Sequence, residues 1–176
     1  MKIEKGGIQP HNEIFAIFLF KWLFRGGLIT LKISKAMDPL LKKMNFKPEM
    51  KIQIWNAPEE LNPLIEGWKN EGFLASSGEK PTFLLAFVYS KEDIDQYFEA
   101  MHALSPEDEA LWVAYPKGTS KKYNVKINRD SGWTKAGELD YEAVRQIAIN
   151  EDWSALRFRK LKYIKTLTRK FSAKDQ

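Results

Sequence analysis

Residues 82–89 read TFLLAFVY, and residues 110–115 read ALWVAY. Both runs are almost continuously apolar, which is typical of strands that are covered on both faces of a sheet. Between them, Ser90 can cap a helix whose first turn is acidic, and apolar residues then recur at helical spacing as far as Leu104. Two buried strands joined by a helix predict a βαβ unit, in which the two strands lie side by side and run parallel.

The sequence on either side of this unit predicts the rest of the sheet. Residues 51–55 (KIQIW) alternate in polarity and predict a first strand, and residues 59–71 predict a short helix that is interrupted at Pro63. Near the end, residues 144–149 and 155–164 predict two strands joined by a five-residue turn, as in an antiparallel pair. We therefore expect an α/β domain with a mostly parallel sheet and an antiparallel strand pair at its C-terminal end.

Composition divides the chain into four parts. We expect an N-terminal hydrophobic and basic extension over residues 1–36, a linker over 37–50, the α/β domain over 51–166 and a basic tail over 167–176. Within the domain, a helical turn is expected to begin over residues 140–142.

Residues 14–31 are long and apolar enough to raise the question of a membrane span. Lys21 and Arg25 lie near the middle of this segment, and their insertion cost of about 2.5–3.5 kcal/mol each offsets the gain from the apolar residues. An interfacial helix with snorkelling basic side chains and an extension outside the domain both stay open. We favour the extension, and we expect a chain that begins at Met37 to fold and to stay in solution.

The net charge of +5 is unevenly spread along the sequence. Residues 59–109 hold twelve acids and three bases, whereas residues 110–176 hold seven acids and fifteen bases. Two interpretations are open. The basic third can neutralise the acidic third within the fold, or it can form a surface that attracts nucleic acid or another anionic partner.

Several classes of site do not fit this composition. The chain has no cysteine, which excludes disulfides, thiolate metal sites and cysteine nucleophiles. Its two histidines, His11 and His102, are far apart in the sequence, which does not suit a histidine zinc site or a catalytic triad. The dinucleotide pattern GxGxxG does not occur. We expect neither a metal ion nor a cofactor.

Three segments carry candidate anion-binding residues. The first follows a buried strand and reads PKGTSKK over residues 116–122, the second is RDSGW over 129–133, and the third is LRFR over 156–159. In the third segment, alternation places two arginines on one face of a strand, about 7 Å apart. Pairing of these arginines with acids from residues 59–109 is the alternative. The candidates are Lys117, Ser120, Lys121, Arg129, Arg157 and Arg159.

Polar residues beside these segments could form the rim of a site. They are Asp130, Asp152, Trp153 and Ser154. Because open α/β sheets bind ligands at the carboxyl ends of their strands, a site is expected only if the loops after Trp55 and Tyr115 meet the turn over residues 150–154 at one edge.

The segments LWVAYPKGTSK (111–121), INRDSGW (127–133) and VRQIAINEDWSALRFR (144–159) together resemble an uncharacterised bacterial family of small proteins with a domain of unknown function. The resemblance covers residues 50–165, and WSALRFR is its most specific element. Asn150 departs from the pattern, in which Asp is frequent, and this departure weakens the case for a carboxylate at that position. The resemblance implies no activity.

The order of strands and helices is also similar to the second half of class I methyltransferases, without the glycine-rich loop that binds the methyl donor in those enzymes. This likeness implies a reduced, Rossmann-like sheet. The sequence thus predicts a cytoplasmic, non-enzymatic α/β domain with a basic surface for a nucleotide, a nucleic acid or an acidic partner, and no membrane partner. The alternatives are a small transferase related to the S-adenosylmethionine-dependent methyltransferases and a protein-interaction adaptor that uses the acidic residues 59–109.

Overall fold

The computed structural model describes residues 37–166 and Ala173. The N-terminal extension, with its apolar segment, and most of the basic tail lie outside the described residues. Within the described part, none of the helices has the length and apolar character needed to cross a membrane.

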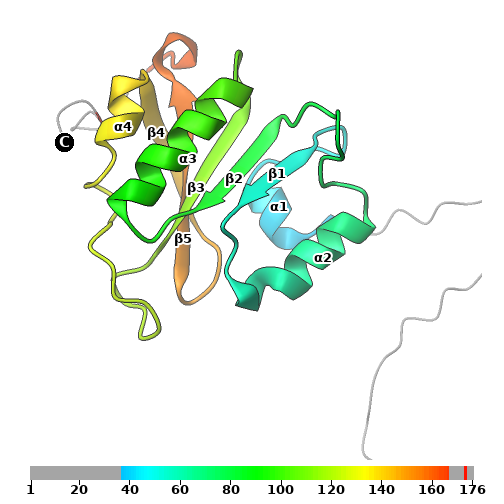
Figure 1. Ribbon diagram of the computed structural model, residues 1–176, viewed down its shortest axis with the longest axis horizontal. Helices are drawn as coiled ribbons and strands as arrows, with labels where there is room; N and C mark the ends of the chain where they lie inside the picture. The colour runs from blue at the N-terminus through cyan, green and yellow to red at the C-terminus, as the bar shows by residue number, and fades with distance from the viewer. Residues whose placement is uncertain (1–36, 167–172, 174–176) are drawn as a thin grey trace, which may run out of the picture. The chain divides into compact units, whose positions relative to one another are not determined.

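Five strands form one mixed sheet in the order β1-β2-β3-β5-β4 (Figure 1). Strand β2 is parallel to both β1 and β3, and β5 is antiparallel to both β3 and β4. The structure therefore confirms the α/β class, the parallel neighbours β2 and β3, and the antiparallel closing pair. The strands are β1 (Ile52–Trp55), β2 (Phe83–Phe87), β3 (Ala110–Pro116), β4 (Tyr141–Ala148) and β5 (Trp153–Lys160).

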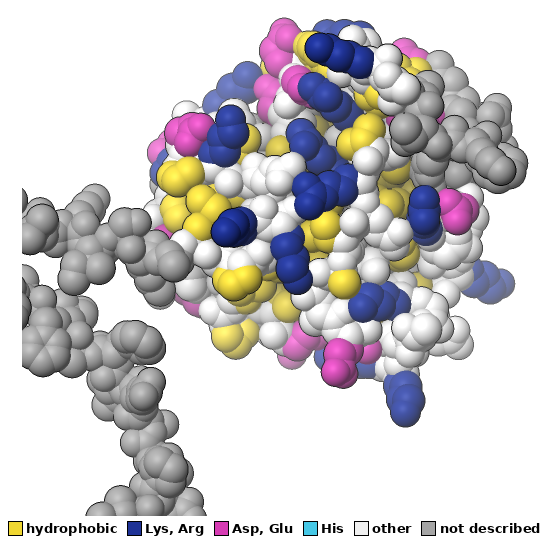
Figure 2. All heavy atoms as spheres, turned by 180° about the vertical axis from the view of Figure 1, so that it is seen from behind, with side chains coloured by type: hydrophobic (Ala, Val, Ile, Leu, Met, Phe, Trp, Pro, Cys, Tyr) yellow, Lys and Arg dark blue, Asp and Glu magenta, His cyan; other side chains and the backbone are white. Residues whose placement is uncertain are grey.

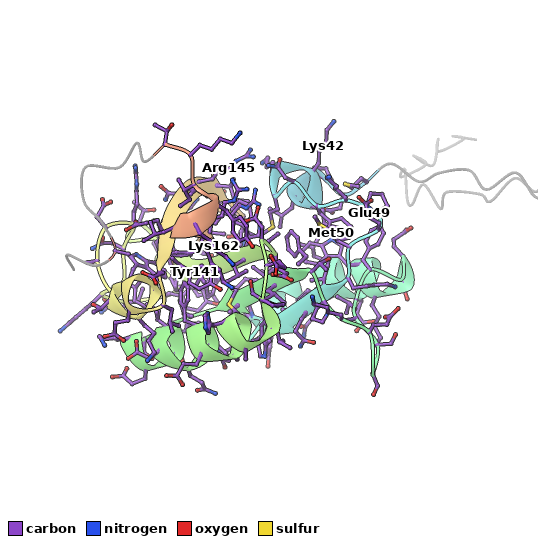
Figure 3. All side chains as sticks on the ribbon, turned by 90° about the horizontal axis from the view of Figure 1, so that it is seen from above. Lys42, Glu49, Met50, Tyr141, Arg145 and Lys162 are labelled. Carbon is purple, nitrogen blue, oxygen red and sulfur yellow. The ribbon has the colours of Figure 1, made fainter. Side chains whose placement is uncertain are left out.

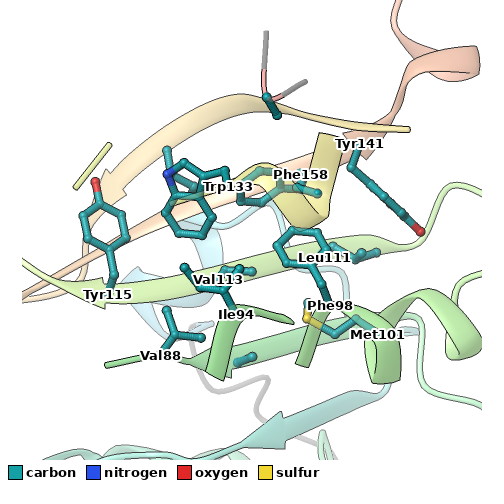
Figure 4. Packing of buried hydrophobic residues seen from close by; sticks show 14 of the residues in the cluster. Val88, Ile94, Phe98, Met101, Leu111, Val113, Tyr115, Trp133, Tyr141 and Phe158 are labelled. Carbon is teal, nitrogen blue, oxygen red and sulfur yellow. The ribbon is translucent and has the colours of Figure 1, made fainter. Parts of the chain in front are cut away.

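Every residue of β2 and β3 is buried, because both faces of the sheet are covered at its centre. On one face, α3 (Lys91–Leu104) and α4 (Thr134–Glu138) lie in front of the sheet, and α3 contributes Ile94, Phe98 and Met101 to the core (Figures 1 and 4). The Ser90 hydroxyl and the Asp93 carboxylate form the capping box that starts α3. On the other face, the core includes residues from α1 (Pro39–Lys43) and α2 (Asn62–Asn70). The domain thus has three layers.

Residues 37–50, expected as a linker, are instead part of the folded domain. Leu41 and Met44 are fully buried and Phe46 nearly so, in the core on the α1 side. The short helix α1 is capped by the Asp38 carboxylate, which accepts the backbone N–H of Leu40 and Leu41. Three apolar side chains on one side of a short helix and its following turn were not enough to predict burial from the sequence.

Three element boundaries also differ from the expectations. A 3-10 turn η1 (Glu59–Leu61) precedes α2, and Pro63 lies in the first turn of α2, where a missing N–H has no cost, so it starts the helix and does not interrupt it. The expected helical turn over residues 140–142 is wrong, because α4 ends at Glu138 and β4 begins at Tyr141. Strand β5 ends at Lys160, and residues 161–163 form η2 (Leu161–Tyr163).

The helix that follows β1 and the helix that follows β2 lie on opposite faces of the sheet. After β1 it forms α2 on one face, and Leu74 then bridges in parallel to Ile52 on the outer edge of β1. After β2 it forms α3 on the other face. The loops that follow β1 and β2 therefore diverge, which is the arrangement at which open α/β sheets bind ligands.

Candidate anion-binding site

The loop after β3 meets the β4–β5 turn at the carboxyl edge of the sheet. The backbone N–H of Lys117 donates to the Asp152 carbonyl (2.7 Å), and its Nζ donates to the Asn150 carbonyl (2.6 Å). The Ser120 hydroxyl donates to Asp152 Oδ1 (2.7 Å). Two of the candidate anion ligands, Lys117 and Ser120, therefore hold the loop against the turn.

The loop after β1 joins the same edge through Glu60. Its Oε1 accepts the Tyr123 hydroxyl (2.5 Å) and the Trp153 indole N–H (3.2 Å), and its Oε2 lies 2.9 Å from Lys122 Nζ. Burial alone would raise the pKa of Glu60, but the hydrogen bonds from Tyr123 and Lys122 bring it down to about 2. The loops after β1 and β3 and the β4–β5 turn thus share one rim, as a site at this edge requires.

Aromatic rings occupy this rim. Tyr89, which follows β2, lies with its ring centroid 5.7 Å from that of Tyr123 and 5.2 Å from that of Trp153, and the last two are 5.1 Å apart. Trp153 is fully buried and also meets Phe87 edge-on. Burial, with the nearby Tyr123 and Glu60, raises the pKa of Tyr89 to about 12. The rings pack against one another at the carboxyl edge of the sheet, where open α/β sheets in general bind ligands.

The other polar rim residues are not gathered with Asp152. Ser154 is buried in β5, opposite Tyr115. Asp130 lies in a turn that Gly132 closes at φ +96°, and fully buried Trp133 anchors this turn to the core on the α3 side. Arg129 Nε lies 3.7 Å from Asp130 Oδ1, although neighbours in an extended chain would not pair.

A pocket of about 300 Å³ lies beside the edge strand β1, and none of the candidate residues from the sequence lines it. No lining side chain ionises; the lining residues are Ile52, Gln53, Ile54, Ala57, Asn62, Ile65, Leu74 and Ala75. Among the described residues, no group of three His, Asp or Glu side chains could hold a metal ion.

Part of the C-terminal basic charge is neutralised by the acidic residues 59–109. Lys122 pairs with Glu60 and Lys135 with Glu99 (2.8 Å). Arg159 forms two hydrogen bonds with the Asp108 carboxylate, of which the one from Nε is 2.7 Å long. The interpretation of internal neutralisation therefore holds for these three basic residues, and Arg159 is not available as one half of a two-arginine clamp.

Arg157 behaves differently from Arg159. Among residues 37–166 and Ala173, its guanidinium makes no hydrogen bond and no ion pair, and its Nε is buried without an acceptor. Burial lowers the pKa of Arg157; Asp108 partly opposes this effect, whereas Arg159 and Arg145 add to it. Directly opposite Arg157 on β3 lies fully buried Trp112, whose indole N–H also has no acceptor in the described part of the chain.

A β-bulge brings a second arginine to Arg157. The register pairs Ala143 with Phe158 and then Arg145 with Arg157, so that Val144 is the extra residue. Without the bulge, Val144 would face Arg157 and Arg145 would point to the other side of the sheet. Bulges are frequent next to functional sites because they redirect a side chain in this way.

The C-terminal end of α1 adds lysines to this face. Arg145 Nη1 donates to Asn45 Oδ1 (3.1 Å), and Asn45 follows α1, whose last turn contains exposed Lys42 and Lys43. Lys42 and Arg145 project from the same side of the molecule (Figure 3), and Lys and Arg side chains gather near the middle of that side (Figure 2). We call Lys42, Lys43, Arg145 and Arg157 the α1–β5 basic surface.

The structure therefore distributes the six sequence candidates over separate places. Lys117 and Ser120 bind the turn, and exposed Lys121 follows them in the loop. Arg157 lies five residues along β5 from Asp152, about 16 Å at the usual rise per residue. Arg145 was missed, although it lies in the VRQ segment of the family-like pattern, because only the bulge places it beside Arg157.

Comparisons with known proteins do not assign a family. No family model and no curated protein matches the chain. Among solved structures, one match is a protein in the NADB-Rossmann superfamily from Streptococcus agalactiae, with 11% sequence identity and a TM-score of 0.38. The match covers 68% of this chain and 55% of that chain, so this chain spans about half of its length. It identifies neither a ligand nor an activity.

Proposed function

We propose that this domain is a non-enzymatic module that binds an anionic ligand through the α1–β5 basic surface. The observation that carries the proposal is the guanidinium of Arg157, which has no acceptor among the described residues and a buried Nε. A partly buried cation without a partner loses hydration and gains nothing in return. An anionic ligand would supply the missing acceptor.

The neighbourhood of Arg157 supports the same conclusion. Like charges directly opposite each other on antiparallel strands destabilise the sheet, and Arg145 faces Arg157 in this way. Asp108, the acid whose charge acts on Arg157, is already bonded to Arg159. The domain thus keeps an arrangement that is unfavourable for folding alone and favourable for binding an anion.

The rim residues give weaker support to the transferase alternative. Proton transfer near neutral pH needs a group whose pKa lies near the working pH. Glu60, with a pKa of about 2, stays ionised, and the Asp152 carboxylate accepts from Ser120. The adaptor alternative is weakened as well, because Lys122, Lys135 and Arg159 neutralise part of the acidic region. The cytoplasmic location and the bacterial source stay predictions from the sequence.

The test is a titration of the full chain with pyrophosphate, ATP and a short single-stranded oligonucleotide at low and at high salt. We expect binding that weakens as salt rises, because the contacts are electrostatic. Arg157→Gln should weaken it by about 10-fold or more, the value of one charge-assisted hydrogen bond.

The matched control is Arg129→Gln, which removes the same charge from an exposed arginine in the loop before α4 and should change affinity by less than about twofold. Absence of binding for all three probes at low salt would overturn the proposal. So would equal losses in the two variants.

A further inference from the structure

The positive charge on this face of the sheet is concentrated at two adjacent arginines, Arg145 and Arg157. Arg157 lies between Trp112 and Arg145 across the strands. The neighbours of Arg157 on the same face of β5 are Ala155 before it and Arg159 after it. Ala155 is apolar, and Arg159 is neutralised by Asp108. The two arginines that no described carboxylate neutralises are thus adjacent, and no row of free cations continues from them along the strand.

The positions of these two arginines suit one small oxyanion. Directly opposite residues of antiparallel strands have Cα atoms about 4.5–5.5 Å apart, so the two side chains leave the sheet together. Each guanidinium presents five N–H donors in a planar fork that matches two oxygens of a phosphate or carboxylate. Arg145 uses Nη1 for Asn45, so its remaining nitrogens stay available.

Charge selects between these oxyanions. Arg145, Arg157 and Arg159 with Asp108 leave two positive charges at the site. A phosphate monoester carries nearly two negative charges at neutral pH, whereas a carboxylate carries one. The lysines of α1 are available to the remainder of a larger ligand.

We infer that the ligand is anchored by a single terminal phosphoryl group held between Arg145 and Arg157, as in a phosphorylated metabolite or a nucleotide. This inference rests on the proposed function and specifies its ligand. A nucleic acid, in contrast, would bind through a series of phosphates and would depend on the lysines of α1 as much as on the arginines.

The experiment uses variants that separate charge from geometry. Arg145→Lys and Arg157→Lys keep the charge and lose the fork, whereas the double variant Lys42→Gln/Lys43→Gln loses two charges and keeps both forks. Each full-length variant is titrated with inorganic phosphate, ATP and a 20-nucleotide single strand, and its melting temperature without ligand is recorded. Arg145 is exposed, so Arg145→Lys tests the inference even if a change at Arg157 disturbs the fold.

We expect inorganic phosphate to compete with ATP, and each Arg→Lys variant to bind phosphate about 10-fold or more weakly. The lysine double variant should weaken phosphate binding less than either Arg→Lys variant does, because it keeps both guanidinium forks. If the oligonucleotide binds but phosphate does not compete, or if Arg→Lys changes leave phosphate affinity unaltered, the inference is wrong while the proposed function stands. If no anion binds, the proposed function itself fails.

Discussion

The carboxylate of Glu60 accepts a hydrogen bond from the indole N–H of Trp153 at 3.2 Å, across 93 positions of sequence. The same oxygen accepts the Tyr123 hydroxyl. One side chain in the turn after β1 thus ties together the loop after β3 and the first residue of β5. We therefore expect this carboxylate to stabilise the carboxyl edge of the sheet.

Glu60→Gln should therefore remove a pH-dependent part of the stability. The pKa of Glu60 is about 2 in the fold, below its ordinary value of 4.5, so its ionised form stabilises the folded state above pH 4.5. This contribution is lost as the pH falls from 4.5 towards 2. We expect Glu60→Gln to cost about 1–3 kcal/mol at pH 7, measured by urea unfolding, and progressively less at lower pH.

The control for this measurement is Glu59→Gln, which changes the exposed neighbouring acid. It should leave the free energy of unfolding within about 0.5 kcal/mol of the wild type. A Glu60→Gln variant whose unfolding free energy follows the wild-type curve at every pH would show that the carboxylate does not tie the loops.

Trp153→Ala should be among the most destabilising single changes in the domain. Its ring is fully buried against Phe87, Tyr89 and Tyr123, and replacing such a side chain by alanine costs about 3–5 kcal/mol. Trp153→Phe keeps a ring and loses the hydrogen bond to Glu60, so it should cost less. Thermal unfolding followed by circular dichroism measures both, and similar melting temperatures for the two variants would contradict the described packing.

Leu41→Ala tests whether residues 37–50 belong to the domain. Leu41 is fully buried, so its truncation should cost about 2–5 kcal/mol, whereas exposed Lys43→Ala should cost very little. A chain without residues 1–36 and with no other change should also unfold cooperatively in a thermal melt, because Met37 begins a compact unit. A Leu41→Ala melting temperature equal to that of the wild type would restore the linker interpretation.

Asp108→Asn should strengthen anion binding. It removes the carboxylate that neutralises Arg159 and adds one positive charge beside Arg157. The charge of Arg159 would act on the phosphate from a few ångströms beyond Arg157. At the effective dielectric of a protein surface, such a charge adds about 1 kcal/mol to the binding free energy, or roughly fivefold in phosphate affinity. Calorimetric titration checks this value, and weaker binding in Asp108→Asn would place the ligand elsewhere.

The centre of the fold was predictable because its residue types and its periodicity indicate the same secondary structure. Strands β2 and β3 are apolar at every position, and Ser90 and Asp93 mark the start of α3, so residue type and periodicity agree there. The burial of α1 was not predictable, since it depends on the apolar face that residues far along the chain create for Leu41 and Met44.

The candidate site was predictable only in part, for a similar reason. Alternation correctly placed Arg157 and Arg159 on one face of β5. Only Arg159 is paired with a carboxylate, and this difference depends on Asp108, which is 51 positions from Arg159 in the sequence. Arg145 reaches Arg157 only through the bulge at Val144, a shift of one residue that no pattern in the sequence marks.

Strand β5 joins β3 to β4 and is the last of the described strands to be synthesised. Strand β5 lies between β3 and β4, so the two have no common partner until residue 160 has been synthesised. A nascent chain that stalls before Trp153 would present two open strand edges, which favour misassembly and attract proteases. A chain that ended before Trp153 would therefore lose more than its final strand, because β4 would have no partner in the sheet and the edge of β3 that β5 covers would stay open.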